Sequence, residues 1–329
     1  MPRFIIQHIT KYTYAEPVRD SANQIKLFPL KDEYQQVQAQ KITISGDPFL
    51  EIVKDYYENE VGSFMNVAPH KELSIDSTIS VMTSSRPFPT EEVETTLQWK
   101  HLDEIRDMLP FIDFLKQEAV TELAQVKAVA DAGFYKTVSV FTAVQQLNKY
   151  VYDNFKYIKG ITSVETTVDE IWQIKAGVCQ DFAHILLVML RLLSVPARYV
   201  SGYVCPQNNS LRGEGATHAW VEAYIPFYGW LGIDPTNNCI VNDRHVRLAI
   251  GRNFADCSPV KGTYKGTASQ TLEVGVSVSH EDGVVNNMTA AILTAQAVTA
   301  SLQTREAGSN SYRRYMEMVQ QQQQQQQQQ

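Results

Sequence analysis

Residues 182–193 constrain the fold more than any other stretch of this chain. They read F-A-H-I-L-L-V-M-L-R-L-L, and a helix that is apolar nearly all round has to be buried in a core. Gly177 marks a break before this helix, so Cys179 falls at or just before its first turn. Unpaired N–H groups and the helix dipole favour negative charge there, and a cysteine attacks a carbonyl only as its thiolate. The sequence therefore predicts a buried helix with a potential nucleophile at its start.

Two runs that follow the helix have the alternation of β-strands. In residues 216–225, small apolar residues alternate with the polar or aromatic residues His218, Trp220, Glu222 and Tyr224. This period of two predicts a strand whose second face lines a cleft. The next run, residues 228–234, carries Asp234 on the same face as Trp230 and Gly232. The candidate cleft-lining residues are Gln180, Trp220 and Glu222.

A hairpin would bring two of these polar side chains together. If its short loop is centred on Pro226, then His218 lies directly opposite Asp234. Directly opposed residues are close enough for a side-chain hydrogen bond. Cys179, His218 and Asp234 would then supply a thiol nucleophile, its general base and the group that orients the base.

The other thiols and the histidine of the helix fit simpler interpretations. A lone cysteine is more often a packing residue than a nucleophile, which suits Cys205, Cys239 and Cys257. His184 lies inside the apolar helix and is interpreted as a hydrogen-bonded core residue. An acyl-transfer site also needs an oxyanion hole, for which the backbone N–H of Cys179 is the first candidate donor. For a second donor the spacing does not choose between the side chains of Trp172 and Tyr157.

Several segments carry a resemblance to a known family. They are G-V-C-Q-D-F-A-H (177–184), P-A-R-Y-V-S-G-Y (196–203), T-H-A-W-V-E-A-Y (217–224), D-P-T-N-N (234–238) and H-V-R-L-A-I-G-R (245–252). In these segments, and around residues 256–262, the chain resembles the bacterial transglutaminase-like proteins. Residues 7–14 resemble the β-rich domain that precedes the core in those proteins. The resemblance extends over residues 1–280 and does not include the C-terminal segment.

The resemblance implies an α+β fold with a papain-like cysteine-peptidase core. It assigns Cys179 as nucleophile, His218 as general base and Asp234 as orienting partner. It implies attack on an amide carbonyl of a peptide or protein, after which a primary amine gives transamidation and water gives hydrolysis. The family also includes proteins of other activities. A cysteine peptidase or amidase that only hydrolyses, and a catalytically idle binding module on the same fold, therefore remain alternatives.

Composition narrows the class of protein. With 44% apolar and 20% charged residues among 329, the chain is typical of a globular protein with two domains. A net charge of −7 argues against nucleic-acid binding. No apolar run of about 18 residues is present, and the N-terminus turns polar too soon for a signal peptide. The four cysteines lack zinc-ligand spacing. We expect a cytoplasmic protein with no metal, no cofactor and no membrane association.

The order of the patterns predicts three regions. Short strand patterns, including residues 3–14 and 22–29, predict a β-sandwich within residues 1–100. Helical patterns at 111–131, 139–154 and 166–175 belong to a catalytic core over residues 101–280. A nucleophile helix packed on an antiparallel sheet makes this core α+β. Residues 281–329 end in an uninterrupted glutamine run and are predicted to be a low-complexity tail, disordered or helical.

Overall fold

The computed structural model describes residues 1–90, 92–118, 120–132, 136–205, 212, 217–280, 291–292 and 296–298. The chain divides into two compact units, each assembled from separated segments. Among the described residues, a β-rich unit takes in 1–88, 198–219 and the chain from 241 onward, and a helical unit takes in 89–197 and 220–240. The predicted domain limits at residues 100 and 280 follow sequence patterns, and they stay a prediction.

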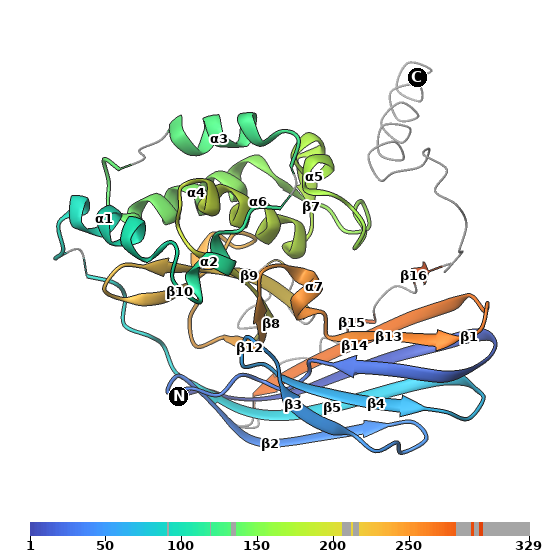
Figure 1. Cartoon of the computed structure of the whole chain (residues 1–329). Coiled ribbons are helices and arrows are strands. Elements are labelled where there is room, and N and C mark those ends of the chain that lie inside the picture. Colours follow the sequence, from blue (N-terminus) through green and yellow to red (C-terminus); the bar gives the residue numbers. More distant parts are fainter. Residues whose placement is uncertain are drawn as a thin grey trace, which may run out of the picture. The chain divides into compact units, whose positions relative to one another are not determined.

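The long strand β1 (Arg3–Ile25) organises the β-rich unit. Its first half lies between β5 (His70–Thr83) and β14 (Gln270–His280), with antiparallel pairing to both (Figure 1). Its second half pairs instead with β4 (Glu60–Asn66) and β13 (Val260–Lys265). Two further strands lie outside these: β2 (Gln35–Ile44) pairs with β5, and β3 (Glu51–Lys54) pairs with β4.

The two strands predicted at 3–14 and 22–29 are thus parts of one strand. Pairing with β5 is irregular between Thr13 and Val18, where Pro17 cannot donate to a ladder. Such an irregularity bends a strand. Here it lets β1 leave one set of partners and join another without a turn.

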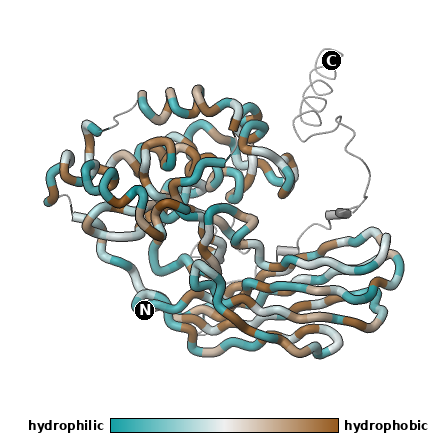
Figure 2. The backbone as a smooth tube through the Cα atoms, viewed as in Figure 1, coloured by the Kyte–Doolittle hydropathy of each residue, from teal (hydrophilic) through white to brown (hydrophobic). Residues whose placement is uncertain are grey.

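Alternation along the strands builds the core of this unit. Phe4 and Ile6 of β1 are fully buried, as are Ile75 and Ile79 of β5, and Figure 2 shows apolar and polar residues alternating along these strands. The same core contains residues from two further strands, β8 (Ala197–Val204) and β12 (His245–Gly251), which contribute Tyr203, Val246 and Leu248.

Helices make up most of the second unit. They are α1 (Thr95–Ile105), α2 (Phe111–Leu115), α3 (Leu123–Ala132), α4 (Val140–Asn154), α5 (Val168–Ile174) and α6 (Cys179–Leu192). The prediction missed α1. It also joined α2 and α3 into one helix, although the chain turns to an extended conformation at Lys116. The predicted α4 and α5 are confirmed, and Ser139 and Thr167 cap their first turns through side-chain oxygens.

The predicted central helix, α6, is confirmed as a buried helix. From Asp181 to Arg191 every residue is buried, His184 only in part, and α6 contacts α3, α4 and α5. At its C-terminal end the guanidinium of Arg191 donates to the carbonyl oxygens of Phe114 and Ala197. These bonds tie the end of the helix to α2 and to the start of β8.

A five-stranded sheet carries the predicted hairpin. Its order is β11-β10-β9-β8-β12, where β9 is Thr217–Ile225, β10 is Gly229–Asp234 and β11 is Cys239–Ile240. A short parallel pair, β6 (Lys156–Tyr157) and β7 (Ala176–Gly177), leads into α6, and a short helix α7 (Phe254–Cys257) follows β12. Helices and antiparallel strands therefore occur in separate stretches of the core, as predicted for the α+β class.

Within the predicted C-terminal tail, the structure describes two short strands, β15 (Ala291–Ile292) and β16 (Gln296–Val298), which pair with β14. These five residues are neither disordered nor helical, and the prediction for the rest of the tail stays a prediction. Residues 281–290, 293–295 and 299–329, including the glutamine run, lie outside the described part of the chain. No helix in the described part is long and apolar enough to cross a membrane.

Candidate active site

Cys179 is the first residue of α6, as its sequence context predicts. Val178 precedes the helix in an extended conformation, and its carbonyl accepts the first helical hydrogen bond from the N–H of Phe182 at 3.1 Å. The Cys179 thiol is free and its residue is partly exposed. A thiol in this position lies beside unpaired backbone N–H groups and the positive end of the helix dipole.

The remaining three cysteines have different surroundings. Cys205 and Cys257 are fully buried, and burial raises the pKa of each thiol well above its usual range. The Cys257 thiol also donates to the carbonyl oxygen of Tyr199. Cys239 forms no disulfide and is partly exposed, but it lies in β11 and not at the start of a helix. Burial and position thus distinguish Cys179 from the other thiols.

The hairpin of β9 and β10 forms, but the predicted register is wrong by two residues. The observed pairs place Trp230 opposite Tyr224 and Gly232 opposite Glu222. Continuing this register sets Asp234 level with Trp220, so Asp234 is not directly opposite His218. A shift of two residues keeps both side chains on the same face of the hairpin. They are therefore diagonal neighbours in register and not an opposed pair.

The turn explains the shift. The N–H of Tyr228 donates to the carbonyl of Ile225 at 3.1 Å, so Pro226 is the second residue of a four-residue turn rather than its centre. Phe227 and Gly229 take left-handed conformations, with φ of 66° and 104°. Proline suits the second position because its φ is fixed near the required value.

Aromatic contacts support the observed register. Tyr224 and Trp230 meet edge to face, with ring centroids 5.6 Å apart. Phe111 and Phe114 of α2 contact Tyr224 and Trp230 at 4.7 and 5.3 Å. This packing attaches the hairpin to α2 and explains why the face predicted to line a cleft is covered at this end.

Asp234 is fully buried at the end of β10, and its carboxylate accepts hydrogen bonds from the residues that follow it in the chain. Oδ1 accepts from the backbone N–H groups of Thr236 at 2.9 Å and Asn237 at 3.3 Å. Oδ2 accepts from the side-chain amide of Asn237 at 2.7 Å. These three bonds fix the orientation of the carboxylate. The role of Asn237 was missed, although it lies in the quoted D-P-T-N-N segment.

The other predicted site residues of β9 are buried. His218 is 2% exposed, Trp220 0% and Glu222 3%, so in this state they offer almost no surface to a ligand. Gln180, the second residue of α6, is partly exposed. A cleft-lining role for Gln180, Trp220 and Glu222 stays a prediction.

The two candidates for the second oxyanion donor differ in surroundings. The indole N–H of Trp172 donates to Gln125 at 3.4 Å, and its ring packs against Phe155 and the ammonium of Lys175. Tyr157 instead pairs with Gly177 in the β6–β7 ladder, two residues before the nucleophile. This register favours Tyr157 over Trp172, and either assignment stays a prediction.

His184 is part of α6, as interpreted from the sequence. Burial lowers its pKa to about 4, with opposing contributions from the charges of Glu118, which raises it, and Arg191, which lowers it. An imidazole in this environment is neutral at physiological pH.

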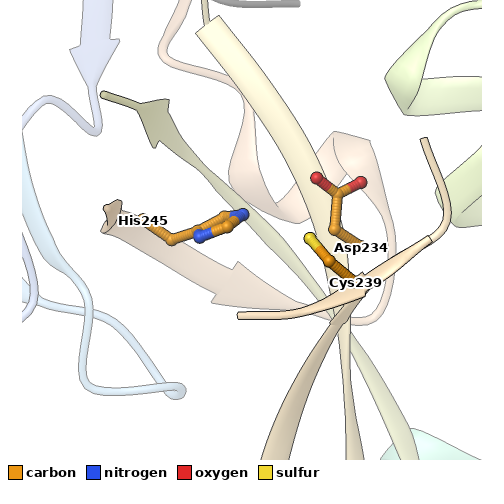
Figure 3. A group of neighbouring side chains, drawn as sticks. All are labelled: Asp234, Cys239 and His245. Atoms are coloured by element: carbon orange, nitrogen blue, oxygen red, sulfur yellow. The ribbon is translucent and has the colours of Figure 1, made fainter. Parts of the chain in front are cut away.

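One group of side chains in the described residues combines the donor atoms that a metal ion prefers. The carboxylate of Asp234, the thiol of Cys239 and the imidazole of His245 have ligand atoms within 4.8 Å of one another (Figure 3). Asp234 and Cys239 are directly paired across β10 and β11. The carboxylate already accepts three N–H bonds, which leaves it less free to bind a cation. We assign no metal to this group.

Comparison with known proteins identifies the family. Residues 128–235 match a model described as the transglutaminase-like superfamily, and residues 4–82 match the bacterial transglutaminase-like N-terminal region. An uncharacterised protein of Mycobacterium leprae is 31% identical over 284 residues, which are 85% of this chain and 99% of that protein. The chain belongs to the bacterial transglutaminase-like family.

Two further matches concern the activity and the fold of relatives. A protein-glutamine gamma-glutamyltransferase of Pseudomonas aeruginosa is 32% identical over 97 residues, which are 27% of this chain and 14% of that protein. The crystal structure of a proposed cysteine protease from Cytophaga hutchinsonii has a TM-score of 0.66 at 23% identity, over 85% of this chain and 91% of the other. The second likeness concerns the fold, and it agrees with the predicted papain-like core preceded by a β-rich domain.

Proposed function

We propose that this transglutaminase-like protein is a thiol enzyme that transfers or hydrolyses the acyl group of amide bonds in peptides or proteins. One observation carries the proposal. Of the four cysteines, all in the described part of the chain, Cys179 combines a partly exposed free thiol with the first position of a buried helix. Backbone N–H groups at a helix N-terminus stabilise a thiolate, which is the nucleophilic form of a cysteine.

The proposed reaction uses three side chains. The thiolate of Cys179 attacks the amide carbonyl carbon, and the backbone N–H of Cys179 stabilises the oxyanion that forms. His218, as imidazolium, gives its proton to the leaving amine when the C–N bond breaks, which leaves an acyl-enzyme thioester. Asp234, oriented by Asn237, holds the imidazole of His218 in the required tautomer.

The molecule that attacks the acyl-enzyme in the second step of the reaction decides the product. A primary amine that attacks the thioester gives a new amide, and water gives the acid. In both cases neutral His218 takes a proton from the acceptor and the Cys179 thiolate leaves. Because a relative from Pseudomonas aeruginosa is named a protein-glutamine gamma-glutamyltransferase, a glutamine side chain is the first amide to test.

The test offers a glutamine-containing peptide with and without a primary amine, and weighs the products by mass spectrometry. We expect amine incorporation or conversion of glutamine to glutamate, lost in Cys179→Ala. Cleavage of the peptide backbone would favour the cysteine-peptidase alternative. If wild type and Cys179→Ala leave a panel of glutamine peptides equally unchanged, the proposal fails.

The alternative of a catalytically idle binding module predicts ordinary thiol chemistry. Brief treatment with iodoacetamide at pH 7, followed by peptide mapping, separates the two. Fast labelling of Cys179 relative to Cys239 supports the enzyme, and equally slow labelling of both supports the binding module. We further propose a cytoplasmic location, because none of the four cysteines, all in the described part of the chain, forms a disulfide.

A further inference from the structure

Asp181 is a buried carboxylate for which the proposed reaction has no role. It is the third residue of α6 and is 2% exposed. Its Oδ2 accepts a hydrogen bond from the backbone N–H of Val178 at 2.7 Å. Because Val178 directly precedes Cys179, this bond holds the backbone at the point where the thiol-bearing turn begins.

A second donor reaches the same oxygen from another part of the helical unit. The hydroxyl of Thr162, in the segment between β6 and α5, donates to Oδ2 at 2.6 Å. Its neighbour Ile161 packs in an apolar cluster with Ile174 and Ala176. The hydroxyl is thus carried by a packed segment, and it links that segment to the start of α6.

Gly177 permits the close approach of this carboxylate. A Cβ atom at residue 177 would overlap the Asp181 side chain, with Cβ–Cβ separation of 2.7 Å and a still closer approach to Oδ2. Two atoms of that kind cannot come so near without moving the backbone or the carboxylate. The glycine two residues before the nucleophile therefore belongs to the same arrangement.

Burying a carboxylate costs folding free energy, so a protein that keeps one gains something from its position. Burial raises the pKa of Asp181, against the lowering by its bonds from Thr162 and Val178, so the anion is disfavoured where it lies. A helix start can be capped by an exposed serine, threonine or asparagine without this cost. The cost indicates that the carboxylate serves the residues it holds.

We propose that Asp181 is a positioning residue for Cys179: with its carboxylate bound to Val178 and Thr162, it fixes the turn that presents the thiol. The inference rests on the proposed role of Cys179 as nucleophile. Asp181 acts through the backbone and through Thr162, and it takes no part in bond making.

The closing experiment compares substitutions that differ by one contact. Thr162→Val removes the hydroxyl and keeps the shape of the side chain, whereas Thr162→Ser keeps the hydroxyl. Asp181→Leu removes both acceptor oxygens, whereas Asp181→Asn keeps one oxygen that can accept both bonds. Each variant is treated with iodoacetamide at pH 7, and the labelling rates of Cys179 and Cys239 are measured in the same sample together with the melting temperature.

We expect Thr162→Val and Asp181→Leu to slow labelling of Cys179 by roughly tenfold or more, since small displacements of a reacting group cost that much. Labelling of Cys239 should not change in any variant. In Thr162→Ser and Asp181→Asn, Cys179 should be labelled at about the wild-type rate. Gly177→Ala should match Thr162→Val. The alkylation needs no substrate, so it reports on the turn directly.

Two failures can be told apart, that of this inference and that of the proposed function. If Thr162→Val lowers the melting temperature but its Cys179 is labelled at the wild-type rate, Asp181 is a structural cap and the inference is wrong. The same holds if Cys179 and Cys239 change together. If wild-type Cys179 is no more reactive than Cys239, the proposed function itself fails, whatever the variants show.

Discussion

The buried histidine of β1 predicts a measurable loss of stability in mild acid. His8 is 1% exposed, with Nδ1 bonded to the hydroxyl of Tyr203 at 2.8 Å and Nε2 to that of Thr10 at 3.2 Å. Burial lowers its pKa from 6.5 to about 4. As the pH falls below 6.5, the unfolded chain binds a proton that the folded chain does not. Stability contributed by the neutral ring is therefore complete above pH 6.5 and is lost toward pH 4.

The magnitude follows from the two pKa values. With 6.5 for the unfolded chain and about 4 for the folded one, linkage gives a loss of about 2 kcal/mol between pH 7 and pH 5. His8→Asn keeps an amide at the position of Nδ1 and cannot titrate. Its cost in packing is the same at both pH values, so it cancels in the comparison. Wild type should lose about 2 kcal/mol more than His8→Asn over this interval.

Urea unfolding of both proteins at pH 7 and pH 5 measures this difference. Hydrogen exchange of the β1 amides assigns the transition to the β-rich unit, which matters because two units need not unfold together. Tyr203→Phe serves as a control that keeps the titrating ring and should keep the loss in acid. An equal pH dependence in wild type and His8→Asn would refute the reasoning and show that folding does not lower the pKa of the ring.

The parts of the core that local signals specify were predictable. The buried helix with Cys179 at its first position follows from an apolar run after a glycine. α5 follows from a capping pattern, since Thr167 and Glu170 bond reciprocally at its start.

The hairpin register was not predictable from alternation. A period of two fixes the face of each residue, but it fits every register that differs by two residues. The turn decides among them, and here a non-glycine residue, Phe227, takes φ of 66°. Such a conformation is uncommon for bulky residues, so the sequence gives no reason to place it there.

Contacts between segments that are distant in the sequence could not be predicted for a similar reason. Thr162 and Asp181 meet across 19 positions of the chain, and β14 pairs with β1 from the far end of the described sequence. Neither contact produces a periodic pattern in the sequence, because each depends on how the intervening chain folds. Asn237 is different: it lies three residues after the carboxylate it binds, and the tendency of aspartate to start such turns could have indicated it.

Cys179→Ala should abolish turnover of a glutamine peptide with little change in melting temperature, because one partly exposed sulfur contributes little packing. Substantial remaining turnover would exclude the mechanism. His218→Ala should slow the alkylation of Cys179 by iodoacetamide at pH 7, because the thiolate loses its imidazolium partner, and an unchanged rate would show that His218 is not the partner. Asp234→Asn should lower kcat more than it raises KM, because an amide cannot stabilise an imidazolium. Its matched variant is Asn237→Ala, which removes the 2.7 Å bond to the carboxylate but leaves the charge, and it should lower kcat less. If Asn237→Ala is the more damaging of the two in steady-state assays, the orientation of the loop matters more than the carboxylate charge, and Asp234 is not the partner of the base.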